Sequence, residues 1–370
     1  MKFSCEKNIL QAACATVSRA VASKSPITAL EGILIEAAGE NVKVTGYDLK
    51  RGIYTSIEAD IPDAGSVVVN ARFFNEMIHR MPDGVVTIEA NANLVMTAKC
   101  GKVKYEFMGI DKSEYPELPD FEGINFLEIP EAILKSMINQ TLYAVSKDEV
   151  RPIYTGSLFE INGNELTLVS VDGYRLAKRV ETVENTKLED CKFIVPGFAL
   201  SDVEKVCSDN EENVKLEIGE KHISFKIGET VIITRRLEGE FLNHRSSIPS
   251  EFKYVIKANR SEFMSVIDRV ALILTNGEGR SPIKLNFRNG SINCTCNTTL
   301  GKAEDLCICE GSGDELEIGF NDRYLMDALK AADKDEILIC LNSSIQPCII
   351  KAADGTENFT YMILPVRLHA

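Results

Sequence analysis

Two closely spaced cysteine pairs are the residues of this chain that most suggest metal or thiol chemistry. Cys294 and Cys296 form the first pair, and Cys307 and Cys309 form the second. Four thiolates suit zinc, but structural zinc sites usually place about two to four residues between paired cysteines. Here one residue separates the members of each pair, and in an alternating strand both side chains then share a face. The spacing predicts reduced cysteines in a hydrophobic core and no metal site.

Other catalytic patterns are also missing from the sequence. The four histidines are His79, His222, His244 and His369, and none lies in a Ser/His/Asp, Cys/His or HExxH arrangement. Asp172 is a carboxylate without an evident partner. These observations favour a protein that is not an enzyme and needs no cofactor. The alternative that stays open is an enzyme with a cysteine nucleophile, which loss of turnover on thiol alkylation would reveal.

Composition points to an intracellular globular protein of several domains. The 370 residues are 45% hydrophobic and 26% charged, with a formal charge of −14 and eleven cysteines. No apolar run approaches the roughly 18 residues of a membrane span, and Met1–Lys7 lacks a secretory core. We therefore expect a cytoplasmic protein with reduced thiols and no membrane partner. The acidic total leaves nucleic acid possible, because binding depends on local positive charge.

A long internal repeat organises the chain. Three segments share the order β-rich stretch, amphipathic helix, β-rich stretch, and each contains a second helix near its start. The residues before the later helices, Val69, Val195 and Gly319, are 126 and 124 residues apart. A period of this length indicates a triplicated domain. Asn70 and Asn321 stand where their side chains can cap a helix.

Helical periodicity predicts one buried face on every helix. The faces of the first helices are Ile9, Ala13, Val17 and Ala20; Ile133, Met137, Ile138 and Leu142; and Phe263, Val266, Ile267 and Val270. The faces of the second helices are Phe73, Phe74, Met77 and Ile78; Leu200, Val203 and Val206; and Leu325, Ala328 and Leu329.

Alternating hydrophobic residues predict strands around these helices, as in Gly32–Glu36, Ser157–Ile161 and Ile283–Phe287. The fold class is therefore α+β, with two helices packed on antiparallel sheets in each repeat. Expected domain boundaries are 1–124, 125–250 and 251–370, with connectors at Tyr115–Asp120 and Phe241–Pro249.

Five strings spread over this repeat resemble the bacterial DNA polymerase III β subunit, the family of sliding clamps. They are Met1–Phe3, Thr45–Leu49, Glu149–Gly156, Val171–Leu176 and Ile363–Leu368. The segment Glu317–Asn321 is similar too. The resemblance covers essentially the whole chain.

The resemblance implies a head-to-tail homodimer whose six domains form a ring around double-stranded DNA, without sequence preference. Phosphate contacts by Lys and Arg suit sliding, because they carry no sequence information. Family DNA contacts map onto Lys24, Arg72 and Arg151. The stretch Met1–Lys24 supports this with a net charge of +3. The dimer interface maps onto Tyr105, Phe107, Leu272 and Ile273, which could instead be ordinary core residues.

The resemblance also implies a cleft that receives short peptides from the DNA polymerase III alpha subunit, the clamp loader, and other polymerases and repair proteins. In this cleft, Arg175 and Arg367 would orient polar groups of the peptide, and Ser246 and Ser247 would make one wall shallow. His369 and Ala370 extend past the usual end. The matching positions are Tyr154, Val171, Gly173, Tyr174, Arg175, Leu176, Leu242, Ile345, Pro347, Met362, Ile363, Leu364, Pro365, Val366 and Arg367.

Simpler readings of the same positions remain. Val171–Gly173 can be only a hairpin turn, and the C-terminal apolar stretch can be only an edge strand. For the whole chain, the alternative is a triplicated scaffold protein with no role on DNA. Retention on circular plasmid separates that scaffold from a clamp.

Overall fold

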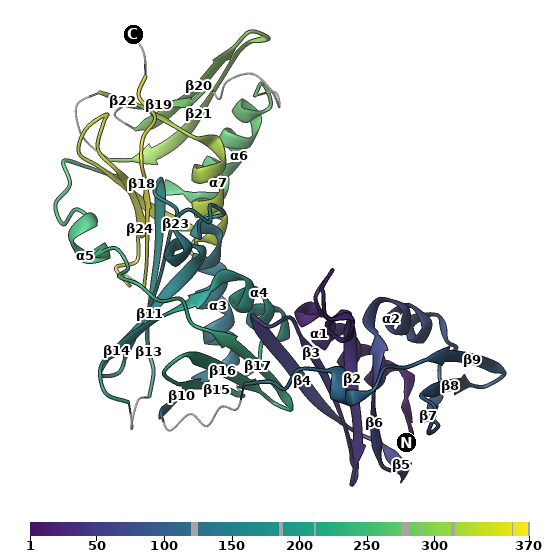
Figure 1. Cartoon of the computed structure of the whole chain (residues 1–370). Helices are drawn as coiled ribbons and strands as arrows, with labels where there is room; N and C mark the ends of the chain where they lie inside the picture. Colours follow the sequence, from purple (N-terminus) through teal and green to yellow (C-terminus); the bar gives the residue numbers. More distant parts are fainter. Residues whose placement is uncertain are drawn as a thin grey trace. The chain divides into compact units, whose positions relative to one another are not determined.

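A computed structural model shows the three repeats as similar sets of helices and strands (Figure 1). It describes residues 1–119, 125–184, 188–210, 212–274, 281–288, 290–311, 315–356 and 358–368. His369 and Ala370, expected near the cleft, lie outside the described residues. The chain divides into two compact units, and each is described by itself. The first consists mainly of Met1–Leu134 and Ser201–Arg236, and the second mainly of Lys135–Glu184, Glu189–Leu200 and the chain from Leu237 onward.

Each repeat contributes two helices, as predicted. Asn70 accepts a hydrogen bond from the amide of Phe73, and Asn321 accepts from the amides of Arg323 and Tyr324, so both predicted caps are confirmed. The connector at Phe241–Pro249 contains a short helix that was not predicted, α5 (His244–Ser247). The paired helices are α1 (Lys7–Val17) and α2 (Ala71–Arg80), α3 (Glu131–Thr141) and α4 (Gly197–Val206), and α6 (Arg260–Ala271) and α7 (Asp322–Ala331).

Most of the predicted helix-face residues are buried, but Ile9 and Phe73 are exposed. Three others are only partly buried: Ile133, Leu142 and Val206. All four predicted residues of α6 and all three of α7 are buried. On α1 the buried residues are Leu10, Ala13, Cys14 and Val17, while Ile9 is 45% exposed, so the predicted stripe was displaced at its start. On α2, Phe73 is 44% exposed although Phe74, Met77 and Ile78 are buried. Phe73 therefore faces outward, which matters for assembly below.

The strands of each repeat form two antiparallel sets of four. We call the set that begins with the strand before the first helix the A-set and the other the B-set; the short β5 (Asp60–Asp63) pairs with β1 at the edge of the first A-set. The A-sets are β1 (Lys2–Glu6), β7 (Val85–Ala90), β8 (Val95–Cys100) and β9 (Val103–Met108); β10 (Asn125–Pro130), β15 (Asn213–Ile218), β16 (His222–Ile227) and β17 (Thr230–Arg235); and β18 (Tyr254–Asn259), β23 (Glu336–Leu341), β24 (Cys348–Ala352) and β25 (Phe359–Ile363). The B-sets are β6 (Gly65–Asn70), β2 (Gly32–Ala38), β3 (Asn41–Tyr47) and β4 (Arg51–Glu58); β14 (Cys191–Pro196), β11 (Gly156–Asn162), β12 (Glu165–Val171) and β13 (Arg175–Thr182); and β22 (Leu316–Phe320), β19 (Ile283–Arg288), β20 (Ser291–Thr298) and β21 (Gly301–Glu310).

Consecutive repeats are joined by strand pairing that follows one rule. The last strand of each B-set pairs antiparallel with the last strand of the next A-set, as β4 does with β17 and β13 with β25. In these ladders Arg51 lies opposite Thr234, and Arg175 lies opposite Ile363. Each ladder lies within one compact unit, where it makes a continuous sheet of eight or twelve strands. The joints between repeats are therefore built from backbone hydrogen bonds.

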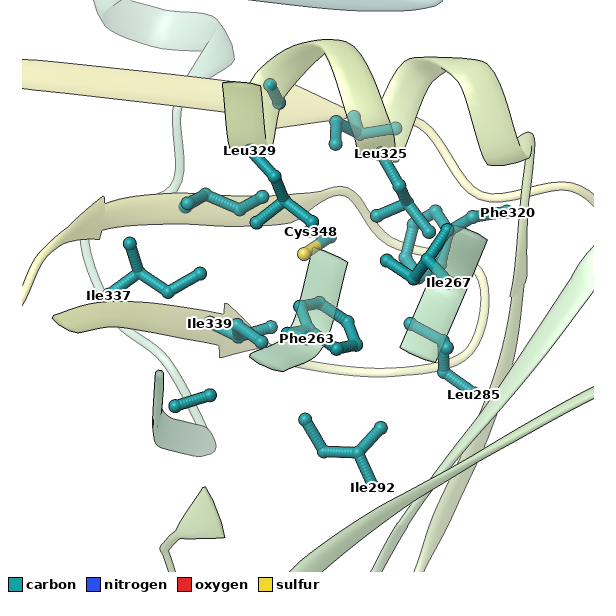
Figure 2. Packing of buried hydrophobic residues seen from close by; sticks show 14 of the residues in the cluster. Phe263, Ile267, Leu285, Ile292, Phe320, Leu325, Leu329, Ile337, Ile339 and Cys348 are labelled. Carbon is teal, nitrogen blue, oxygen red and sulfur yellow. The ribbon is translucent and has the colours of Figure 1, made fainter. Parts of the chain in front are cut away.

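Figure 2 shows the core of the third repeat, where Phe263 and Ile267 of α6 face Leu325 and Leu329 of α7 over the sheet. The four paired cysteines belong to this core, which confirms their interpretation as buried residues. Burial raises the pKa of Cys294 and Cys307 to about 12, so these thiols stay protonated. Among the described residues, no cluster of His, Cys, Asp and Glu is arranged to hold a metal.

Membrane insertion finds no support among the helices that the structure describes. None of them combines the length and the apolar composition needed to cross a bilayer.

Candidate functional site

A hollow of about 820 Å³ in the second unit gathers several of the predicted site residues. Arg151, Tyr154, Gly173, Tyr174 and Arg175 line it, so the turn after β12 and the loop before β11 meet there. The opposite wall comes from the start of α7 and was not predicted from the sequence. That wall consists of Asn321, Arg323, Tyr324 and Asp327.

Aromatic side chains shape this hollow. Tyr174 is 62% exposed, and its ring stacks on Tyr324 with centroids 6.1 Å apart. The guanidinium of Arg175 lies over the Tyr324 ring at 4.5 Å and over the Tyr143 ring at 5.2 Å. A stacked aromatic pair with one exposed ring is suited to pack against apolar side chains of a ligand.

Arg175 makes several polar contacts within the chain. Its Nε donates to Asp172 at 2.9 Å, one terminal nitrogen to Asp327 at 2.6 Å, and the other to the carbonyl oxygen of Tyr143 at 2.7 Å. Burial opposes its charge, but the bonds to Asp327 and Asp172 outweigh this and raise its pKa. Three of the five N–H donors of Arg175 are thus used within the chain, and its orienting role toward a peptide stays a prediction.

An apolar cluster lies beside the hollow. Val171 of β12, Leu176 of β13 and Met362 of β25 are buried in it. Tyr154 and Leu242 pack against it from the side and are only partly buried. Strand pairing explains this gathering, since Leu176 lies opposite both Val171 and Met362. The cluster therefore has a buried apolar centre, with Tyr154 and Leu242 partly exposed at its side.

The remaining predicted positions lie along the end of β25. Ile363 is buried in the core of the third repeat instead of in the cluster. Cys348 pairs with Ile363, so Pro347 and Leu364 follow at the same end of the ladder, both half-buried. The exposed members of the set are Ile345, Val366 and Arg367. Side chains at this end are available to a partner.

A buried polar pair holds the wall that carries Leu242. His244, the first residue of α5, lies 3.1 Å from Glu160 through its Nε2. Arg245 reaches the same carboxylate oxygen at 3.3 Å. Burial lowers the pKa of His244 despite the adjacent carboxylate. For Glu160, burial acts upward, but the hydrogen bond from His244 and the charge of Arg245 lower the pKa overall. The pair fixes α5 on β11.

Acidification is expected to loosen this wall. The unfolded histidine has a pKa near 6.5 and the folded one a lower value, so below about pH 6.5 the unfolded chain binds more protons. Stability then falls with falling pH, by at most about 1.4 kcal/mol per pH unit for this one proton. Urea unfolding at pH 7 and pH 5 should show a smaller pH difference for His244→Gln than for the unmodified protein. An NMR titration midpoint for His244 above 6.5 would contradict the argument.

The predicted DNA contacts divide between the two units. Lys24 and Arg72 belong to the first unit, and both are exposed. Arg72 lines a hollow of about 540 Å³ between the end of α1 and the start of α2, beside Asn75 and Ser18. Arg151 belongs to the second unit and lines the hollow described above. All three side chains are exposed to solvent.

The predicted interface residues also lie at surfaces. Tyr105 and Phe107 are on β9, the edge strand of its sheet, and the Phe107 ring contacts Phe73 with centroids 5.2 Å apart. Leu272 is 80% exposed, which argues against its being an ordinary core residue. Ile273 packs partly against the core of the third repeat.

Comparison with known proteins identifies the family over the whole chain. The family models for the N-terminal, central and C-terminal domains of the DNA polymerase III beta subunit match residues 1–119, 128–243 and 245–367. The chain belongs to the DNA polymerase III beta subunit family. The beta sliding clamp of Bacillus subtilis is 33% identical over all of both chains. That of Halalkalibacterium halodurans is 30% identical, again over all of both chains.

Solved structures of the family agree with this fold. The DNA polymerase sliding clamp from Bacillus subtilis matches with a TM-score of 0.95 at 32% identity, over all of both chains. A DNA polymerase III beta subunit from Eubacterium rectale, described as putative, matches with a TM-score of 0.94 at 30% identity, also over all of both chains. The resemblance seen in the sequence is thus confirmed, and so is the fold of three repeated clamp domains. As a sliding clamp of DNA replication, this beta subunit family member is a non-catalytic processivity factor, and the scaffold alternative is not favoured.

Proposed function

We propose that two copies of the chain join head to tail into a closed ring of six domains around duplex DNA. The observation that carries this proposal is the rule for joining repeats. Within the described chain, β4 and β13 each pair with the last A-set strand of the next repeat. Among the described strands, β21 of the third repeat and β9 of the first repeat have no partner of this kind. A second copy supplies both partners.

Both strands present open edges that need a partner. β9 pairs only with β8 among the described strands. β21 pairs along its length with β20, and its other edge meets β18 only at Cys309 and Glu310. Open edges invite association, and closing them in a ring removes that hazard. The contact is heterologous, because β9 of one copy meets β21 of the other.

The repeat also gives the register of this contact. Arg51 and Arg175, which begin β4 and β13, lie opposite the fifth residues of β17 and β25. By the same rule Gly301, which begins β21, lies opposite Phe107 of the second copy. Lys302 then faces Glu106 of that copy, and Glu304 faces its Lys104. Opposite charges across an antiparallel pair are stabilising.

Exposed apolar residues surround this contact. Leu272 and Leu300 are 80% and 67% exposed beside the start of β21, and Phe73 is exposed beside β9. Apolar side chains with charged residues at their rim are typical of a protein interface. This explains why Phe73, which the helical pattern predicts to be buried, faces outward in a single copy.

Charge exchange tests the arrangement. Lys104→Glu and Glu304→Lys should each weaken the dimer roughly tenfold or more, since both joints of the ring lose a pair worth up to about 1 kcal/mol and gain repulsion. The two variants mixed together should form a mixed dimer, in which every joint again has opposite charges. The double variant Lys104→Glu/Glu304→Lys should recover as well. Analytical ultracentrifugation measures all four cases.

The control is Lys226→Glu, which changes the charge of an exposed residue on β16 of the second repeat and should leave the dimer unaffected. An isologous dimer, in which β9 pairs with β9 of the other copy, would not be restored by mixing. An unmodified protein that stays monomeric at micromolar concentration would remove the ring altogether.

Within this ring, the cleft of the second unit would hold partner proteins on the clamp. We expect it to bind peptides of the DNA polymerase III alpha subunit, the clamp loader, and other polymerases and repair proteins. Lys24, Arg72 and Arg151 would contact phosphates without reading sequence. The site of action would be the cytoplasm.

A further inference from the structure

Arg51 has the same place in the first repeat that Arg175 has in the second. Each arginine is the last residue of a four-residue hairpin turn, and the first residue of that turn is an aspartate, Asp48 or Asp172. Each also pairs with that aspartate through Nε, at 3.4 Å for Arg51 and 2.9 Å for Arg175. Each donates to a backbone carbonyl just after its own repeat's first helix, that of Arg19 or that of Tyr143.

The third contact reaches the next repeat. One terminal nitrogen of Arg51 lies 2.6 Å from Asp202, and the corresponding nitrogen of Arg175 lies 2.6 Å from Asp327. The two aspartates are the sixth residues of α4 and α7. The arginine side chains are only 18% and 11% exposed. The same three contacts thus recur at both joints inside the chain, and we call this arrangement the arginine clip.

The third repeat cannot supply a clip. Its hairpin runs from Thr298 to Gly301, so glycine stands where the other hairpins have arginine. Gly301 has φ +146°, a conformation that side-chain-bearing residues rarely adopt. Thr298 uses its hydroxyl within its own repeat, 3.4 Å from the carbonyl oxygen of Ile273. An arginine at Gly301 would strain the backbone.

The helix of the first repeat that would accept an arginine from another copy, α2, differs from α4 and α7 as well. The sixth residue of α2 is Glu76, the position equivalent to Asp202 and Asp327. Glu76 is exposed and pairs with Arg80 of its own helix. At the proposed contact between copies, the acid is therefore present without an arginine to meet it, and exposed apolar residues such as Leu272 lie nearby.

We infer that Arg51 and Arg175 are positioning residues that fix the two joints inside each chain, and that the joint between copies is built without one. The inference about the joint between copies rests on the proposed ring. Bending a clipped joint breaks charge-assisted hydrogen bonds, and the loss of these bonds leaves buried charges unpaired. Parting two copies breaks strand pairing, apolar contacts and exposed charge pairs, and it leaves no buried charge unpaired. The two joints inside each chain are therefore held more firmly than the joint between copies.

Hydrogen exchange of the full-length protein, followed by mass spectrometry, tests the clip. Arg51→Ala should speed exchange in β4 and β17, and Arg175→Ala in β13 and β25, each by roughly tenfold or more, the factor expected when a charge-assisted bond is lost. Other strands should keep their rates. Asp202→Asn and Asp327→Asn keep the side-chain shape and should give the same local increases.

Matched controls are Arg80→Ala and Arg288→Ala, which remove exposed arginines from the first and second unit and should change no joint. Faster exchange throughout a unit would mean general destabilisation and would overturn the clip, as would unchanged exchange at the joints.

The ring and the clip can fail separately. In the unmodified dimer, amides of β9 and β21 should exchange faster than those of the clipped ladders, and equal rates would overturn the unclipped joint. If no dimer forms, the proposed ring is wrong, while the effects of Arg51→Ala and Arg175→Ala inside one chain still decide the clip.

Discussion

After a clamp loader has placed it, the protein is expected to remain on a closed circular plasmid and to be lost when the plasmid is cut once. The reason is topological: a ring joined through β9 and β21 can leave a circle only by opening, but it can slide off a free end. Gel filtration of labelled protein with the plasmid, before and after linearisation, measures the retained fraction. We expect near-complete retention before the cut and near-complete loss after it.

Salt provides the control for this experiment. A protein held by about six to ten phosphate contacts would lose roughly 10³–10⁵ in affinity between about 50 and 200 mM salt. Retention of a closed ring should change little over that range, provided that the dimer survives. Equal retention on circular and linear plasmid, or loss governed by salt alone, would contradict encirclement.

Removing the exposed ring of Tyr174 is expected to abolish most peptide binding. Tyr174 stacks on Tyr324 at the mouth of the hollow, and truncating an aromatic residue at the centre of an interface costs about 2 kcal/mol or more, roughly thirtyfold in affinity. Fluorescence anisotropy with a labelled peptide from the clamp-binding segment of the replicative polymerase measures the loss in Tyr174→Ala.

Tyr174→Phe is the matched control, because it keeps the ring and removes only the hydroxyl. It should bind the peptide almost as the unmodified protein does. Sedimentation should show the same dimer for both variants, since Tyr174 belongs to neither β9 nor β21. Unchanged peptide affinity in Tyr174→Ala would remove the hollow from the binding site.

The repeat and its helices could be predicted from local sequence because their signals are local. Asn70 and Asn321 cap helices through amides two or three residues away, and the face of α6 follows from its own periodicity. Burial of Cys294 and Cys296 could be inferred from strand alternation within a few residues. Such features depend on neighbours along the chain, so one sequence suffices.

The site walls could not be predicted because they join distant residues. Arg175 and Asp327 are 152 positions apart, and no local pattern links them. The resemblance placed Arg175 in a cleft but could not show its contacts with Asp327 and Tyr143. Ile9 was predicted to be buried from a stripe that α1 displaces by one position. The exposure of Phe73 depends on a surface that periodicity cannot distinguish from core.

The ladders between β4 and β17 and between β13 and β25 have a consequence for anyone who shortens the gene. A product that stops before the third repeat would carry β13 without β25. β13 would then be an edge strand with unpaired backbone groups instead of an interior strand. Such fragments are expected to aggregate when expressed. Because strands pair between consecutive repeats, we expect that a single repeat cannot be expressed as a separate soluble domain.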